Sequence, residues 1–319
     1  MTGVAEPSAG RPAGSGSPDR SGAPDRSGAE QADRADPLAA TVGGFVGTSW
    51  NAYLAGHSLG RQPAGYADAL RAVLEDGWGR RGAAGWDTWV TRSTEVGDLL
   101  GETSLGAGPG QVVVGDSTSV QLYKLVSAAC DARPGRSVIV GAAGDFPTDR
   151  YVAEGVAAAR SMSLRQPLWG WWGQDDMLAL GPRYDPAPGV RRFEVGTPPI
   201  LGMVGVEVGA RLVAAAGQRS LRQRGLRLME MAISCARAWL EPLGAEVSGP
   251  GEPAGRGAHL SLRHQRSEWL CGRARSQAGV LCDFRRPDVL RLGMSPLSTG
   301  FVELWDAMAA LAGILAEAG

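Results

Sequence analysis

The chain has 319 residues, of which 44% are hydrophobic and 20% charged, with a formal net charge of −1. This composition is typical of a soluble globular protein that buries one large core or two modest ones. A balanced charge gives no basic surface for nucleic acid or for anionic lipid. The sequence contains no run of 18 apolar residues and no secretory signal pattern, so we expect a cytoplasmic protein.

Cysteine, histidine and lysine are scarce and scattered. No CxxC pair occurs, and the three histidines, His57, His259 and His264, complete no zinc pattern. We therefore expect no metal site, and we interpret the cysteines as small buried residues. Lys124 is the only lysine, which matters because an amine condenses with aldehydes and a guanidinium does not.

Residues 1–40 are rich in Gly, Pro, Ser, Ala, Asp and Arg, and they contain the near-repeat "SPDRSG" and "APDRSG". Such a segment has too little apolar surface to offset the entropy of ordering. The composition predicts a disordered tail over residues 1–40.

Residues 41–218 read as the first globular region. Apolar residues at helical spacing predict a helix near 66–78, and a second helix is expected within 86–102. Next, "QVVVGD" and "RSVIVG" each read as a short strand that leads through a small loop into a helix. Two such units in succession indicate an α/β fold with a parallel sheet covered by helices.

Residues after 167 are loop-rich until two helices, predicted near 201–216 and 219–241. The last part, 219–319, reads as that long helix followed by a small α/β domain, with a strand at 258–264, a helix at 268–279, short strands at 280–295 and a closing helix. The closing helix has apolar residues at spacings of three and four, namely Phe301, Leu304, Trp305, Met308, Leu311 and Leu315.

Hydroxyl side chains stand where the first of these strands leads into its helix. Ser117, Thr118 and Ser119 at a helix start indicate an anion site, because free backbone N–H groups and the helix dipole both favour a phosphate. Taken alone, an ordinary helix cap explains the same residues.

Six motifs in a fixed order extend this interpretation. They are "LAGHSLG" at 54–60, "DSTSVQLYKL" at 116–125, "DFPTDRY" at 145–151, "WGWWGQ" at 169–174, "GTPPIL" at 196–201 and "VLRLGMSPL" at 289–297. With them the chain resembles kynureninases over residues 45–319. The resemblance implies a pyridoxal 5'-phosphate (PLP) hydrolase of fold type I, the aspartate aminotransferase or aminotransferase class V fold. That fold has a three-layer αβα large domain and a small C-terminal α/β domain.

The resemblance also implies roles for individual residues. Cofactor contacts are expected from Thr118, Ser119, Phe146, Pro147, Thr148, Asp149, Trp171 and Thr197, the last two across the interface of a homodimer. Substrate contacts are expected from His57, Ser58 and Arg291, with Arg291 gripping the α-carboxylate. Gln174 stands where the family often has histidine.

Simpler explanations remain open for several of these residues. Asp149 is also explained as a first-turn acid favoured by the helix dipole, and Trp171 as a core residue. Arg291 is also explained by a surface ion pair. A structural role is the better explanation of His259 and His264.

The 21 residues between Asp149 and Trp171 are too few for the units that the family places there. A single parallel crossover already needs a dozen or more residues. The missing units would carry the pyridinium-binding aspartate, a nearby histidine and the lysine that forms the Schiff base. We therefore place an in-frame loss of the central large domain at Ser161–Arg165. We expect Lys124 to be a solvated or snorkelling helix residue that does not replace the lost lysine.

Three interpretations of function follow. The first is the family activity, cleavage of kynurenine or 3-hydroxykynurenine to an anthranilate and alanine, in tryptophan catabolism and NAD biosynthesis. The second is a non-catalytic remnant that binds the cofactor or dimerises. The third is a sequence from which a segment of the natural enzyme has been lost. For the chain as it stands, we expect negligible turnover.

Overall fold

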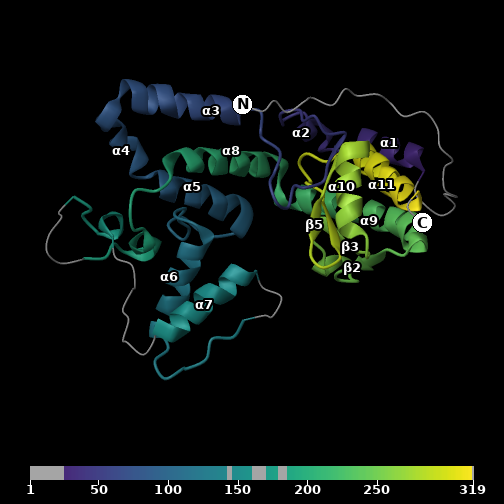
Figure 1. Cartoon of the computed structure of the whole chain (residues 1–319). Coiled ribbons are helices and arrows are strands. Elements are labelled where there is room, and N and C mark those ends of the chain that lie inside the picture. The colour runs from purple at the N-terminus through teal and green to yellow at the C-terminus, as the bar shows by residue number, and fades with distance from the viewer. Residues whose placement is uncertain (1–24, 142–145, 160–169, 179–184, 318–319) are drawn as a thin grey trace, which may run out of the picture. The chain divides into compact units, whose positions relative to one another are not determined.

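The computed structural model describes residues 25–141, 146–159, 170–178 and 185–317. These residues form two units (Figure 1). The first, here called the terminal unit, combines residues 1–62 with 219–319, and the second, here called the middle unit, spans 63–218. Residues 41–62, predicted to accompany the large domain, lie in the terminal unit because strand β1 (Ala52–Tyr53) pairs in parallel with β4 (Val280–Leu281).

An antiparallel sheet organises the terminal unit. Its strands are β2 (Glu246–Ser248), β3 (His259–Arg263), β6 (Val289–Gly293) and β5 (Asp283–Arg285), in that spatial order. Leu260 and Leu262 of β3 lie opposite Leu292 and Leu290 of β6, and all four are buried. This alternation of buried and less buried side chains is the one predicted for residues 258–264.

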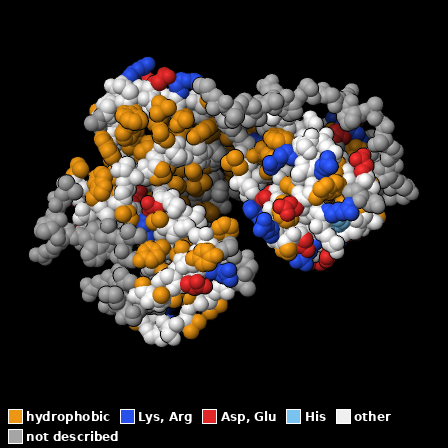
Figure 2. Space-filling view, viewed as in Figure 1, with side chains coloured by type: hydrophobic (Ala, Val, Ile, Leu, Met, Phe, Trp, Pro, Cys, Tyr) orange, Lys and Arg blue, Asp and Glu red, His pale blue; other side chains and the backbone are white. Residues whose placement is uncertain are grey.

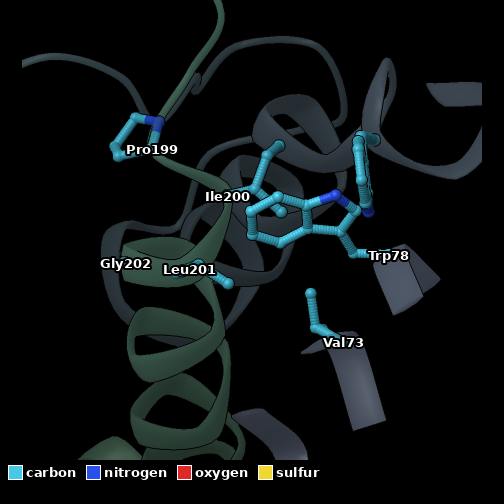
Figure 3. A pocket seen from close by; sticks show the side chains of 7 residues that line it. Val73, Trp78, Pro199, Ile200, Leu201 and Gly202 are labelled. Carbon is cyan, nitrogen blue, oxygen red and sulfur yellow. The ribbon is translucent and has the colours of Figure 1, made fainter. Parts of the chain in front are cut away.

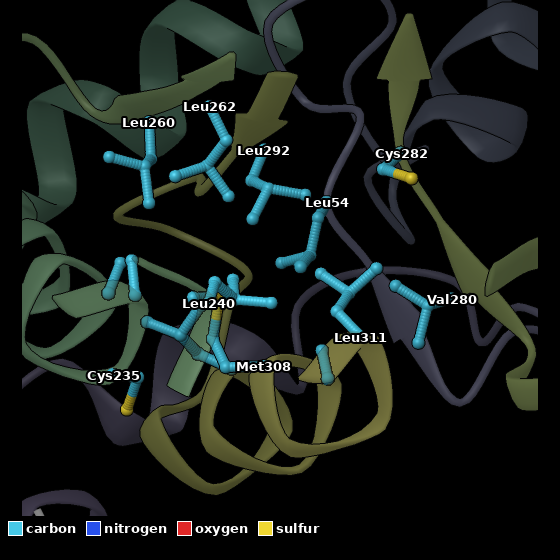
Figure 4. Close-up of a cluster of buried hydrophobic side chains, with 14 of the residues drawn as sticks. Leu54, Cys235, Leu240, Leu260, Leu262, Val280, Cys282, Leu292, Met308 and Leu311 are labelled. Carbon is cyan, nitrogen blue, oxygen red and sulfur yellow. The ribbon is translucent and has the colours of Figure 1, made fainter. Parts of the chain in front are cut away.

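Three helices complete that core. They are α9 (Gln218–Cys235), which continues as a π-helix over Ala236–Leu240, α10 (Ser267–Ala278) and α11 (Phe301–Ala316). The six apolar residues predicted along the closing helix are all buried in α11. Figure 4 shows leucines from the strands meeting Met308 and Leu311 of that helix in one hydrophobic cluster.

The predicted disorder of residues 1–40 is wrong for the part that the structure describes. Helix α1 (Arg26–Arg34) begins at the Asp25 cap and packs against α11, with Ala29 fully buried, and the short helix α2 (Ala39–Val42) follows it. The Asp33 carboxylate accepts hydrogen bonds from the backbone N–H groups of Phe301 and Val302 at 2.7 and 2.9 Å. Tertiary contacts thus order a segment whose composition alone favours disorder. Residues 1–24 lie outside the described residues.

The middle unit is helical in the residues that the structure describes. It contains α3 (Tyr66–Ala72), α4 (Trp86–Trp89), α5 (Arg92–Leu100), α6 (Thr118–Asp131), α7 (Pro147–Ala159) and α8 (Ile200–Ala216). Helix α8 packs against α3 and α5, and α6 packs against α7 (Figure 1). A π-helix over Val73–Arg80 extends α3.

The two strands predicted in the middle unit do not form. Residues 111–116 and 137–141 form no strand and have no ladder partners, and the described part of this unit contains only the isolated bridge between Gln174 and Pro186. Val138 and Val140 are 75% and 89% exposed. A parallel strand is stabilised by neighbours on a buried sheet, and the described part of this chain supplies none here.

The only membrane-spanning candidate among the described residues is a bent pair formed by α8 and the Gln218–Leu243 helix. It passes by length and composition alone, and no single helix passes.

Candidate functional site

The start of α6 has the predicted helix cap, although the strand predicted before it does not form. Ser117 is the N-cap, and its hydroxyl accepts a hydrogen bond from the Val120 N–H at 3.4 Å. Thr118 is exposed and Ser119 half-buried in the first turn. Asp116, just before the cap, adopts a left-handed backbone conformation with φ of 47°. The turn leaves backbone donors and hydroxyls at the helix start, as an anion site requires.

Lys124 is not solvated, so the expectation for its side chain is wrong. The residue is 1% exposed, and its ammonium group pairs with the Asp116 carboxylate and donates to the Phe193 carbonyl oxygen at 2.6 Å. A buried ammonium group needs such partners because leaving it unpaired costs several kcal/mol. The only amine side chain of the sequence is therefore engaged inside the middle unit and is not presented to a ligand.

A second buried ionisable group, Glu194, was not identified from the sequence. It follows Phe193 directly and accepts a hydrogen bond from the Ser93 hydroxyl. Burial raises the pKa of its carboxyl group, and the hydrogen bond from Ser93 and the charges of Arg191 and Lys124 partly oppose this. Lys124 thus joins the exposed Asp116, just before α6, to the backbone of Phe193, which directly precedes the buried Glu194.

The predicted cofactor box at 146–149 lies at the start of α7. Pro147 is the first residue of that helix, and the Asp149 N–H donates to the Phe146 carbonyl oxygen at 2.9 Å. Thr148 and Asp149 are half-buried, whereas Phe146 is 67% exposed. Packing of α6 on α7 brings both predicted cofactor segments onto one helix pair.

The tryptophan-rich motif forms an aromatic cluster. Trp171 and Trp172 meet edge to face with ring centroids 4.9 Å apart, and Trp86 packs on both at 6.2 and 5.6 Å. Trp172 is fully buried and Trp171 half-buried. Within one chain, core packing thus accounts for Trp171, and its contact across a dimer stays a prediction. The junction predicted at Ser161–Arg165, just before this motif, lies outside the described residues.

Thr197 is exposed near an apolar pocket of about 430 Å³. Trp78 and Val73 face Ile200 and Leu201 across it, at the start of α8 (Figure 3). The lining offers almost no polar surface to orient a ligand, so the pocket is not assigned a function.

The three predicted substrate residues meet around one carboxylate in the terminal unit. Asp283 of β5 accepts hydrogen bonds from the Ser58 hydroxyl at 3.0 Å and from Arg291, and its Oδ2 lies 3.2 Å from the His57 Nε2. Arg285 lies 3.3 Å from the same oxygen. Asp283 lies opposite Arg291 because β5 pairs with β6, and the bridge between Ala55 and Gly293 brings the loop at 54–60 to the same strand.

Asp283 was not identified from the sequence. It lies within residues 280–295, for which short strands were predicted, and pairing of those strands could have placed it beside Arg291. Burial alone would raise the pKa of its carboxyl group. Hydrogen bonds from Arg291, His57 and Ser58 outweigh burial and lower the pKa to about 2. Asp283 is therefore ionised at neutral pH and holds all three predicted substrate residues.

His57 sits against β6 because residue 293 is glycine. A side chain at Gly293 would collide with His57 Nδ1, and the Gly293 N–H donates to the Leu54 carbonyl oxygen at 2.6 Å. The His57 ring also lies 5.9 Å from the His259 ring. Burial lowers the pKa of His57, with Arg291 adding to the effect and Asp283 opposing it. His57 is thus neutral at pH 7.

Two buried nitrogens of this cluster, Nδ1 of His57 and Nε of Arg291, have no hydrogen-bond partner among the described residues. Buried polar groups are normally paired, and unpaired ones mark sites where a ligand or water completes the network. Arg291 thus has donor capacity beyond its ion pair with Asp283. His259 belongs to this cluster through its ring contact, whereas His264 accepts a hydrogen bond from the Arg266 N–H at 3.0 Å in a turn.

Comparisons with known proteins bear on both units. Residues 221–311 match the family model described as the kynureninase C-terminal domain. A kynureninase of Pseudomonas fluorescens is 27% identical over 391 residues, covering 89% of this chain and 94% of the relative, and one of Burkholderia pseudomallei (strain K96243) matches to the same extent.

Solved structures show the same kind of fold. The apo cysteine desulfurase of Thermococcus onnurineus NA1 superposes with a TM-score of 0.62 at 11% identity, covering 90% of this chain and 98% of that one. A C-DES mutant with glycine linked covalently to its PLP cofactor superposes with a TM-score of 0.62 at 12% identity, covering 83% and 97%. The chain therefore has the fold of fold type I PLP-dependent enzymes, as predicted.

Within that class, the chain is kynureninase-like, and the resemblance drawn from the six motifs is confirmed. The length of the alignment with the Pseudomonas fluorescens relative bears on the predicted internal loss. The alignment runs over 391 residues, whereas 89% of this 319-residue chain is about 284 residues, so about 107 aligned positions have no residue of this chain opposite them. This agrees with the predicted internal loss.

The residues present fit one end of PLP and not the other. The start of α6 offers hydroxyl and backbone donors suited to a phosphate. The aldehyde end requires an amine, and the only lysine is buried in its ion pair with Asp116. The chain therefore has no lysine side chain free to anchor the cofactor covalently.

Proposed function

We propose that this chain has a kynureninase-like function, directed at kynurenine or 3-hydroxykynurenine with PLP as the cofactor. The reaction of that class is hydrolysis of the side-chain carbon–carbon bond to an anthranilate and alanine. Similarity to kynureninases along 94% of the relative's length carries this proposal. The cytoplasm and a homodimer are the setting that we propose for it.

Arg291 is the residue to which we assign the substrate carboxylate. Its guanidinium is partly satisfied by Asp283, and its unpaired Nε leaves a donor for a second carboxylate. An arginine fork suits such bidentate recognition. Asp283 fixes the guanidinium and, through Ser58 and His57, the loop at 54–60.

The buried position of Lys124 limits the chemistry that this chain can carry out on a bound substrate. PLP acts as an electron sink once it is anchored as an imine, and the protein supplies the amine and the orientation. Because the Lys124 ammonium group is buried and paired, we propose for the chain as it stands binding without appreciable turnover. This observation favours the second candidate function, a non-catalytic PLP-fold protein or dimerisation partner.

The test combines binding with a chemical trap. Purified chain is mixed with PLP, the absorbance is recorded before and after borohydride, and kynurenine consumption is followed by chromatography. We expect PLP to bind reversibly, with no cofactor fixed to Lys124 by borohydride and negligible consumption of kynurenine. Cofactor trapped on Lys124, lost in Lys124→Met and accompanied by enzyme-like turnover, would exclude the non-catalytic candidate.

Substrate binding is tested separately by calorimetry with kynurenine. Arg291→Ala is expected to weaken binding by about tenfold or more, because a charged hydrogen bond contributes about 1.5–3 kcal/mol. Arg285→Ala serves as the matched control, since this exposed arginine also contacts Asp283. Absence of both kynurenine and PLP binding in the parent chain would contradict the proposed function.

A further inference from the structure

Two cysteines lie side by side in the terminal unit. Cys271 on α10 and Cys282 between β4 and β5 have sulfur atoms 3.7 Å apart, and the Cys271 thiol also lies 3.5 Å from the Cys282 carbonyl oxygen. Neither is in a disulfide. Cys282 lies at the edge of the hydrophobic cluster in Figure 4, whereas Cys271 is half-buried and reachable from solvent. The interpretation of the cysteines as small buried residues is confirmed for Cys282, whereas Cys271 is only half-buried and lies beside it.

The surroundings give the two sulfurs different chemistry. A hydrogen bond from Cys282 lowers the pKa of Cys271 to about 7, assisted by the charge of Arg275 one turn along α10. The same hydrogen bond, together with burial, raises the pKa of Cys282. At neutral pH a substantial fraction of Cys271 is thus thiolate, the reactive form in disulfide exchange, while Cys282 keeps its proton.

By contrast, burial raises the pKa of Cys235 to about 12. Its side chain is fully buried in α9. Cys235 is therefore an unreactive core residue, as the sequence predicted, and it provides an internal comparison for the pair.

We propose that Cys271 and Cys282 are a redox-active dithiol that forms a reversible disulfide with small-molecule disulfides as the oxidant. The Cys271 thiolate attacks one sulfur of the oxidant, the oxidant's S–S bond breaks, and one thiolate leaves. Cys282 then attacks the Cys271 sulfur, its proton passes to the second leaving thiolate, and the protein disulfide forms. The two cysteines lose two electrons, and the oxidant is reduced to two thiols.

The geometry requires a modest movement. A disulfide bond is about 2.05 Å long, so the sulfurs must approach by roughly 1.7 Å. Cys282 directly precedes Asp283, the carboxylate that holds His57, Ser58 and Arg291. Oxidation therefore pulls on the strand end that carries Asp283, and we expect it to alter the surroundings of His57.

The test uses the full chain with oxidised glutathione at neutral pH, followed by alkylation and peptide mapping. We expect loss of two of the four alkylatable thiols, a peptide linked through Cys271 and Cys282, and full recovery with dithiothreitol. Cys130→Ser and Cys235→Ala are matched controls that should leave the linked peptide unchanged. Cys282→Ser should stop at a mixed disulfide on Cys271.

Two outcomes overturn the proposal. One is a parent chain that keeps four alkylatable thiols, and the other is a parent chain that ends as a stable glutathione adduct without the linked peptide. Both are read on the unmutated chain, so a variant that fails to fold does not affect them. The coupling to Asp283 is tested by NMR of the histidine ring protons. An unchanged His57 resonance in the oxidised chain would exclude that coupling.

Discussion

The terminal and middle units differ in how they bury apolar surface. Each strand of the terminal sheet has a partner, and the continuous hydrophobic cluster of the described residues lies entirely in that unit. The middle unit buries scattered apolar residues together with the charged groups Lys124 and Glu194. Among exposed large apolar side chains in the described residues, only Val46, Leu59 and Trp269 lie in the terminal unit. Figure 2 shows hydrophobic side chains gathered over the middle unit.

This difference is the one expected in a layered fold from the predicted internal loss. Antiparallel strands close together in sequence, such as β5 and β6, keep their partners when a distant segment is removed. Parallel strands depend on partners from separate strand–helix units, so the segments at 111–116 and 137–141 stay unpaired. In the described residues, the terminal unit therefore keeps its paired strands and the side chains around Asp283, while the middle unit has helices and only an isolated bridge.

The largest expected effect is on the free energy of unfolding, and it compares a leucine of the terminal unit with a leucine of the middle unit. Leu260→Ala should lower the free energy of unfolding by about 2–5 kcal/mol, because Leu260 is buried opposite Leu292 and its removal leaves a cavity. Leu125→Ala, at a residue of α6 that is 57% exposed, should change it by less than about 0.5 kcal/mol. Denaturant unfolding followed by tryptophan fluorescence measures both. Equal losses would contradict the contrast between the units.

A somewhat smaller effect is expected from Gly293→Ala. The added methyl group meets the His57 ring, and overpacking of this kind costs about 1–3 kcal/mol. Gly313→Ala in α11 is the matched control, because nothing lies within 4 Å of its added carbon and alanine is the better helix former. Thermal unfolding should therefore show opposite shifts. A neutral Gly293→Ala would mean that His57 does not rest against β6.

Loss of the long-range cap should cost about 1 kcal/mol. Asp33→Ala removes the acceptor for the Phe301 and Val302 N–H groups and so tests whether α1 belongs to the terminal unit. Glu30→Ala, which removes only exposed pairings with Arg26 and Arg34, should have little effect. Hydrogen exchange at the first turn of α11 is the readout. Unchanged protection in Asp33→Ala would contradict the conclusion that contacts with α11 order residues 25–40.

The smallest effect is a pH dependence that comes from two groups of the terminal unit. Burial lowers the pKa of His57 in the folded chain, so on acidification the unfolded chain binds a proton at a higher pH than the folded chain does. The free energy of unfolding should therefore fall as the pH drops below about 6.5. The pKa of Asp283 is about 2, so its contribution should be lost as the pH falls from about 4 towards 2. Unfolding at a series of pH values measures both windows. His57→Gln should remove the first window alone.

Local signals in the sequence predicted elements that need few partners. Helices α6 and α11 follow from apolar spacing, and β3 follows from the alternation of Leu260 and Leu262. Two-residue strands such as β1 carry no such pattern. Helix α1 is ordered by contacts with α11, such as the hydrogen bond between Asp33 and Phe301, which are 268 residues apart in the chain. Those elements were missed because their stability comes from distant residues.

The candidate site divides in the same way. The resemblance to kynureninases singled out His57, Ser58 and Arg291, which the fold brings together, whereas Asp283 appears only when β5 pairs with β6. The cofactor roles of Thr118, Ser119, Asp149 and Trp171 stay predictions. The proximity of Cys271 to Cys282 likewise depends on how α10 packs against the strand ends.

The sequence by itself determined the class of fold, the order of its motifs and the presence of a single lysine, because these depend on residue identity and local spacing. The tertiary structure alone decided that this lysine is buried against Asp116, that one carboxylate joins three distant side chains, and that two predicted strands stay unpaired. The physical reason is that an ion pair, a strand ladder or a buried position needs a partner residue. Only the folded chain brings together partners that are far apart in the sequence.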